Sequence, residues 1–187
     1  LFKVMKETSS LPISVKMRLA INAKHKKTKP YLRIAKIAQE EGLDFIIVHL
    51  RTAGQEYSGK IDLAALKEIR ETVKIPLVGN GDIVDVKSGI KMKPFCDALM
   101  IGRKAVSDPY LFKQLNLAFK NTKCVFDVIK EKQKCIRQYL RYSEQYNIGF
   151  QHIKIHLQAL LRDTSNDSLI QKLTHTTTIE EIQDLVK

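Results

Sequence analysis

Polar and charged side chains stand at the ends of four short apolar segments of this chain. They are Lys16 with Arg18, His49 with Arg51, Asn80 with Gly81 and Asp82, and Gly102 with Arg103. Glycine lets the backbone approach a ligand closely, and an arginine neutralises a nearby phosphate. With Gly79, which ends the third apolar segment, these residues predict a site for a phosphorylated ligand.

The apolar segments alternate with amphipathic helical patterns over the first 119 residues. We expect strands at 13–19, 44–50, 75–79 and 97–102, and helices at 30–42, 62–73, 84–93 and 107–119. Continuous apolar strands between helices indicate a parallel sheet covered on both faces. A doubly wound sheet and a (β/α)8 barrel both qualify, and both carry their sites at the carboxyl ends of the strands.

A complete (β/α)8 barrel takes about 250 residues, so four units predict the second half of such a TIM barrel within residues 1–119. Residues 120–187 lack strand patterns. Helices expected near 126–146, 150–162 and 178–186 predict an all-α domain there. The chain opens on a helical pattern, LFKVMKE, without an initiator Met. We therefore expect a fragment of a longer α/β protein.

The net charge of +12 suggests a polyanionic partner. Residues 111–162 hold 10 Lys and Arg against 3 Asp and Glu. A basic stripe recurs there at helical spacing: Lys130, Lys134, Arg137 and Arg141. Such a stripe favours contact with nucleic-acid phosphates, the alternative being a solvated helix face. The run KHKKTK at 24–29 has the same two interpretations.

The remaining composition excludes several other classes. No apolar run approaches the roughly 20 residues of a membrane span. Cys96, Cys124 and Cys135 show no CxxC spacing, so neither disulfides nor zinc are expected and a cytoplasmic location is the simplest reading. His152 and His156 stand four residues apart without a third ligand nearby. We therefore expect no metal site.

Four stretches, SVKMRLA, VHLRTAGQEYSG, IPLVGNGDI and DALMIGRKAVSDPYLF, resemble in this order the second half of a tRNA-dihydrouridine synthase. The resemblance covers residues 12–113 and continues weakly in HIKIHLQALLR, which is similar to the family's tRNA-binding helical domain. It implies FMN as cofactor, NADPH as reductant and uridine in tRNA as substrate. It places the FMN site at Lys16, His49, Asn80, Gly81, Asp82, Gly102 and Arg103. It places Arg18, Arg51 and Gln55 near that site without assigning their contacts. We expect these three residues, like the basic stripe, to contact the tRNA substrate.

The resemblance also implies chemistry that this chain does not hold. The family passes hydride from NADPH to FMN and on to C6 of uracil, while a cysteine of an Asn-x-Gly-Cys-Pro loop protonates C5. That loop is absent here and is expected upstream of Leu1. Cys96 precedes its strand and so is expected at the opposite end of the barrel. Ala20 and Leu50 replace usual glycines, and the loop KAVSDPY departs from the family form; both changes narrow the pocket.

Two alternatives remain open at this point. One is another FMN barrel reductase acting on a small molecule, such as a dihydroorotate dehydrogenase relative. The other is a non-catalytic relative that binds RNA. Bound flavin separates the second alternative from both enzymes, and affinity for tRNA separates the first.

Overall fold

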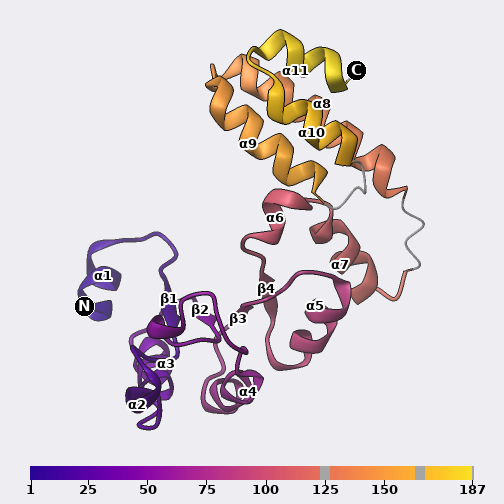
Figure 1. Cartoon of the computed structure of the whole chain (residues 1–187). Helices are drawn as coiled ribbons and strands as arrows, with labels where there is room; N and C mark the ends of the chain where they lie inside the picture. The colour runs from indigo at the N-terminus through magenta and orange to yellow at the C-terminus, as the bar shows by residue number, and fades with distance from the viewer. Residues whose placement is uncertain (123–126, 163–166, 187) are drawn as a thin grey trace. The chain divides into compact units, whose positions relative to one another are not determined.

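The computed structural model describes residues 1–122, 127–162 and 167–186 of the 187-residue chain. It divides into two compact units, Leu1–Gly102 (unit 1) and Arg103–Lys187 (unit 2) (Figure 1). The sequence suggested a boundary after residue 119. The division lies earlier because α6 (Lys104–Ser107) packs against α9 (Phe150–Leu161) of the helical unit.

Unit 1 is built on a parallel four-stranded sheet in the order β1-β2-β3-β4 (Figure 1). Its strands are β1 (Ser14–Arg18), β2 (Phe45–His49), β3 (Leu77–Asn80) and β4 (Ala98–Met100). The predicted parallel α/β sheet is confirmed. The strand order follows the chain without the reversal that marks a doubly wound sheet. This order is the one found within a (β/α)8 barrel.

The helices of unit 1 are α1 (Phe2–Thr8), α2 (Ala23–Lys26), α3 (Pro30–Glu40), α4 (Leu63–Thr72) and α5 (Val86–Met92), with short 3-10 turns η1 (Ala53–Gln55) and η2 (Lys93–Phe95). Three of the helices, α2, α4 and α5, begin at a capping side chain. Asp62 caps α4 by accepting from the backbone N–H of Ala65. Asp85 and Ser88 form a capping box on α5. The predicted positions of α3, α4 and α5 are confirmed to within about two residues.

The two faces of the sheet are unequally covered within unit 1. Met17, Val48 and Gly79 share one face through the strand register, and all three are buried. Lys16 and Ile47 lie on the other face, where neither is fully buried. The sequence suggested full coverage of both faces, and within unit 1 only the first face has it.

Gly79 belongs to the covered face of β3. A Cβ at this position would lie 2.6 Å from Sδ of Met92 and 3.1 Å from Sγ of Cys96. Glycine is needed there because α5 and the segment after it pack directly on the strand. The interpretation of Gly79 as a phosphate-loop glycine is therefore wrong.

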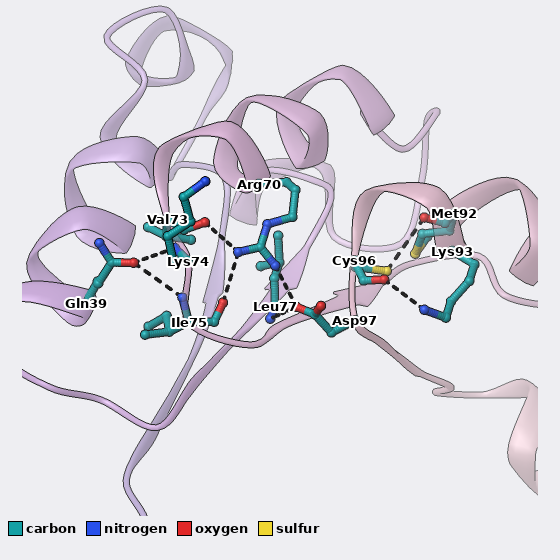
Figure 2. A network of polar contacts seen from close by, with 10 residues as sticks. All are labelled: Gln39, Arg70, Val73, Lys74, Ile75, Leu77, Met92, Lys93, Cys96 and Asp97. Atoms are coloured by element: carbon teal, nitrogen blue, oxygen red, sulfur yellow. Dashed lines mark hydrogen bonds and ion pairs between the residues drawn. The ribbon is translucent and has the colours of Figure 1, made fainter.

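A polar network ties the amino ends of β3 and β4 together (Figure 2). Asp97 accepts from Nη1 of Arg70 at 2.6 Å and from the backbone N–H of Leu77 at 2.8 Å. Arg70 also donates to the carbonyl of Ile75 at 3.3 Å. Gln39 accepts from the backbone N–H of Ile75 at 3.3 Å. The side chains of this network thus satisfy backbone groups that the short strands leave unpaired.

Unit 2 is all-α over its described residues. Besides α6 and α7 (Leu111–Phe119) it contains α8 (Val128–Gln145), α9, α10 (Asp167–His175) and α11 (Ile179–Val186). Its core consists of Ile136, Ile153, Leu157, Leu160, Leu161, Leu173 and Ile182. The helix α10 was not predicted, because the Ser, Thr and Asn residues around it favour loops. No helix of the described residues is long and apolar enough to cross a membrane.

Candidate functional site

The carboxyl ends of the strands meet in register at one end of the sheet. Arg18 pairs with His49, His49 with Asn80, and Asn80 with Met100. Residues in register share a face, as do residues two apart on one strand. Lys16 therefore lies on the same face as Arg18. Four predicted site residues, Lys16, Arg18, His49 and Asn80, are brought together at one end of the sheet.

His49 is almost buried, with 7% of its surface exposed. Burial lowers the pKa of His49 to about 4, and the charges of Arg18, Lys16 and Arg51 act in the same direction. The carboxylate of Asp82 opposes them. At neutral pH the ring is therefore uncharged, with one N–H donor and one nitrogen acceptor.

The ring nitrogens of His49 make no hydrogen bond with any described residue. Lys16 is exposed, and it too has no hydrogen bond or ion pair within the described part of the chain. The polar atoms of a side chain as buried as His49 usually have a hydrogen-bond partner within the protein. The neutral ring of His49, with one donor and one acceptor nitrogen, and the nearby cation of Lys16 are thus available to a ligand.

Arg51 is 3% exposed and holds two loops together. Its Nη1 donates to Oδ1 of Asp82 at 2.8 Å, and its Nη2 donates to the other carboxylate oxygen. Nε also donates to the carbonyl of Gly59 at 3.0 Å. Such a bidentate pair fixes geometry as well as charge. The structure gives Arg51 and Asp82 a positioning role, and their contacts with a ligand remain a prediction.

Gly81 lies against the ring of His49. Its φ of +130° is one that other residues rarely adopt, and a Cβ there would lie 3.2 Å from Cδ2 of His49 and 3.0 Å from Cγ2 of Ile61. Asn80 donates from Nδ2 to the carbonyl of Met100 at 2.7 Å and so joins β3 to β4. The GNGD turn therefore closes the site around His49.

Arg18 and Gln55 organise the loop after β2. Nη1 of Arg18 donates to the carbonyls of Thr52 and Glu56 at 2.8 Å and 2.9 Å. Its guanidinium lies 5.9 Å from the ring centroid of Tyr57. Gln55 accepts from the backbone N–H of Thr52 at 2.9 Å and completes a capping box. The predicted substrate contact of Gln55 gains no support from these bonds, because its carbonyl oxygen is already engaged.

The last predicted residues of the site lie where the two units join in the chain. Gly102 ends unit 1, and an added Cβ would meet nothing within 4 Å. Arg103 is exposed and begins unit 2. Its place beside a phosphate remains a prediction.

The sequence analysis did not single out Gly59 or Ile61. Gly59 supplies a carbonyl to Arg51, and Ile61 packs where a Cβ of Gly81 would lie. The one sequence signal for Gly59 is its place in a Ser-Gly-Lys turn, where its φ is +73°. No comparable signal marks Ile61.

The basic stripe is exposed along α8, as its spacing predicted. On the opposite side Ile136 is buried in the core of unit 2, and Tyr139 and Leu140 pack against that core. The side chain of Ile129, expected on the same side, lies outside the described residues. The four exposed members are Lys130, Lys134, Arg137 and Arg141.

Acids pair with half of this stripe. Lys134 lies 3.1 Å from Oε1 of Glu131, and Lys130 lies 3.6 Å from Oδ2 of Asp127. Arg137 and Arg141 have no ion pair with any described residue. These two arginines are therefore the members with charge to offer a partner.

Cys96 lies before β4, buried at the amino end of the sheet, where burial raises the pKa of its thiol. This supports the expectation that it does not act at the site. Burial also raises the pKa of Cys135 in unit 2, while Cys124 lies outside the described residues. Among the described residues no group of three potential ligands could hold a metal ion.

Comparison with known proteins gives a consistent result. The family model described as dihydrouridine synthase matches residues 1–187. A Mycobacterium leprae protein named probable tRNA-dihydrouridine synthase is 37% identical over 116 residues, which are 60% of this chain and 29% of that protein. A Rickettsia conorii protein of the same name is 32% identical over 163 residues, 82% of this chain and 48% of its own length.

A tRNA-dihydrouridine(16) synthase of Shigella flexneri is 33% identical over 156 residues, 81% of this chain and 47% of that protein. The matched part of this chain thus spans less than half the length of each of these three relatives.

Proposed function

Because this chain belongs to the dihydrouridine synthase family, we propose that it serves the flavin-dependent reduction of uridine to 5,6-dihydrouridine in tRNA. The family match over the whole chain supports this reaction over a dihydroorotate dehydrogenase-like reduction. The observation that carries the site is His49, neutral, nearly buried and without a hydrogen bond to any described residue.

FMN, reduced by NADPH, supplies the hydride for such a reaction when it is bound. The donor set of unit 1 fits this group. Lys16 offers a positive charge to an electron-rich ring, and His49 offers a hydrogen bond without adding charge. Gly102 leaves open space at the end of β4. We assign the cofactor to the predicted residues Lys16, His49, Asn80, Gly81, Asp82, Gly102 and Arg103.

Within this set the residues have different tasks. Lys16 and His49 are the side chains that would touch the cofactor. Asn80 and Asp82 act by holding the strand end and the turn in place through their bonds to Met100 and Arg51. A neutral His49 also avoids placing a third positive charge beside Lys16 and Arg18.

We assign tRNA binding to the helical part of the chain, residues 120–187, and the cofactor to residues 1–119 as half of a (β/α)8 barrel. Arg137 and Arg141 would contact phosphates, because they are exposed and unpaired among the described residues. Such contacts gain affinity by releasing counterions from the RNA. The target uridine must leave its stack at a cost of a few kcal/mol. A tRNA substrate also favours the cytoplasm as the location of this protein.

The test compares Lys16→Met with Lys36→Met in the purified whole protein. Lys36 is exposed on α3, so the control removes the same charge elsewhere in unit 1. A charge-assisted contact contributes about 1.5–3 kcal/mol, so Lys16→Met should weaken FMN binding roughly tenfold or more. Fluorescence titration of the flavin measures the affinity, and mass spectrometry of tRNA nucleosides measures dihydrouridine.

Each alternative function predicts a different outcome of these measurements. A wild-type protein that binds tRNA without flavin would be the non-catalytic relative. A flavoprotein that reduces a small molecule and leaves tRNA unchanged would be the other reductase. Equal flavin affinity in both variants would remove Lys16 from the site while leaving the reaction in place.

A further inference from the structure

The loop between β1 and α3 concentrates positive charge. Residues 19–29, between these two elements, contain four Lys and no Arg, Asp or Glu. All four lie in the run KHKKTK at 24–29, which includes the end of α2 and is called here the basic loop. The reaction proposed above leaves these residues without a task.

The basic loop begins at the carboxyl end of the sheet. The backbone N–H of Leu19 donates to the carbonyl of Arg51 at 3.1 Å. Ala53 and Gly54 donate in turn to the carbonyls of Ala20 and Ile21, each at 2.8 Å. The chain entering the loop thus runs beside the segment that follows His49. The loop therefore starts at the same end of unit 1 as the candidate site.

Two of its lysines fasten the loop to α4. Lys26 is paired with Asp62, the residue that caps α4, at 2.5 Å. Lys29 is paired with Glu68 at 2.8 Å, and Tyr31 donates to the same carboxylate at 2.8 Å. These contacts hold the middle and the last residue of the run against one helix.

The other members of the run point to solvent. Lys24, His25 and Lys27 are exposed, and none has an ion pair with a described residue. Asn22 accepts from the backbone N–H of His25 at 2.8 Å, so the turn is fixed by its backbone as well. Lys26 and Lys29 thus form ion pairs within unit 1. Lys24 and Lys27 remain exposed cations on a backbone whose conformation is fixed.

A merely solvated loop gains from mixing charges of both signs, since opposite charges nearby stabilise each other. The basic loop instead contains no acidic residue, and the acids at α4 pair with only two of its four lysines. We propose that the basic loop is a second tRNA-binding surface, in which Lys24 and Lys27 contact phosphates near the reacting uridine. This inference rests on the proposed function, since it places substrate beside His49.

The test measures tRNA affinity against salt concentration for the whole protein and for K24A/K27A. Each phosphate contact contributes about 0.7–0.9 to the slope of log affinity against log salt. We expect the slope to flatten by roughly 1.5 in this double variant. The matched control is K36A/K74A, which removes two exposed lysines of unit 1, one on α3 and one before β3.

Melting temperature and flavin content should stay at wild-type values in both variants, because Lys24 and Lys27 touch no described partner. If the loop variant keeps the slope of the control, the basic loop is a solvated surface or serves a protein partner, and the inference is wrong while the proposed function stands. If the wild-type protein itself shows no salt-dependent tRNA binding, the proposed function fails. The charge-reversed K24E/K27E variant should show a larger effect of the same sign.

Discussion

The two ends of the sheet in unit 1 both carry polar clusters, yet they differ in how their hydrogen-bonding capacity is used. At the amino end the side chains of Arg70, Asp97 and Gln39 bind backbone groups of neighbouring segments (Figure 2). At the carboxyl end the side chains of Lys16 and His49 make no hydrogen bond with a described residue. Polar residues alone therefore do not indicate a binding site. A better indicator is a side chain that the fold holds in place while its hydrogen-bonding groups stay unpaired within the chain.

Arg51 does not follow this simple division between the ends. It lies just beyond β2 at the carboxyl end, but its guanidinium is engaged with Asp82 and Gly59, like the side chains of the amino-end network. We therefore expect it to respond to mutation as a structural residue.

Arg51→Met should have the largest effect on stability. It removes a buried bidentate partner and leaves the carboxylate of Asp82, 36% exposed, with solvent as its replacement. Breaking a fully buried pair costs 3–5 kcal/mol, so a half-exposed partner predicts about 2–3 kcal/mol. Urea unfolding measures this loss. The double variant Arg51→Met with Asp82→Asn should recover part of it, and no recovery would mean that the pair is not coupled.

His49 should make stability depend on pH. Its folded pKa of about 4 lies below the ordinary 6.5, so between these values the unfolded chain binds a proton that the folded chain does not. The stability contribution is complete above pH 6.5 and falls as pH falls, by at most about 2 kcal/mol at pH 5. Urea unfolding at pH 7 and pH 5 compares wild type with His49→Gln.

The glutamine variant lacks the titrating ring and should lose less stability on acidification than wild type. Equal losses in the two proteins would show that His49 titrates normally. An NMR titration of the ring would then give a pKa near 6.5.

Asp97→Ala should have a smaller effect on stability and none on flavin affinity. It removes an acceptor for Arg70 and for the backbone N–H of Leu77, but the carboxylate is 54% exposed, so water can replace it. We expect a loss of about 1–2 kcal/mol by urea unfolding. A change in flavin affinity larger than twofold would show that the two ends of the sheet are coupled.

The smallest effect is expected in unit 2, from R137A/R141A. Each lost phosphate contact should flatten the salt slope of tRNA binding by about 0.9 or less. The control R162A/K172A removes two other exposed cations of the same unit. Equal slopes would show that the basic stripe is a solvated helix face.

The sequence predicts the regular part of this fold well, because apolar periodicity and capping residues act locally. Pro30 and Asp62 mark the starts of α3 and α4. The helix α10 escapes prediction because its few apolar residues matter only through packing against the core of unit 2. The incomplete cover of the second sheet face is likewise a property of tertiary structure.

The site is predicted less completely. The residue types at the strand ends predict that Lys16 and His49 lie together, and the strand register brings both residues to one face of the sheet. The sequence does not reveal that Arg51 is engaged by Asp82, nor that Gly79 faces Met92. Both depend on contacts between segments far apart in the chain, which no local pattern contains.

The link that Arg51 forms between Asp82 and Gly59 has a consequence for binding kinetics. It connects the turn at Asp82 with the loop at Gly59 through bonds within the chain itself. The entropy of ordering these two loops is therefore lost during folding, not when a ligand arrives. Association should then proceed in one step, with a rate that rises linearly with ligand concentration and does not level off at a loop-closing limit.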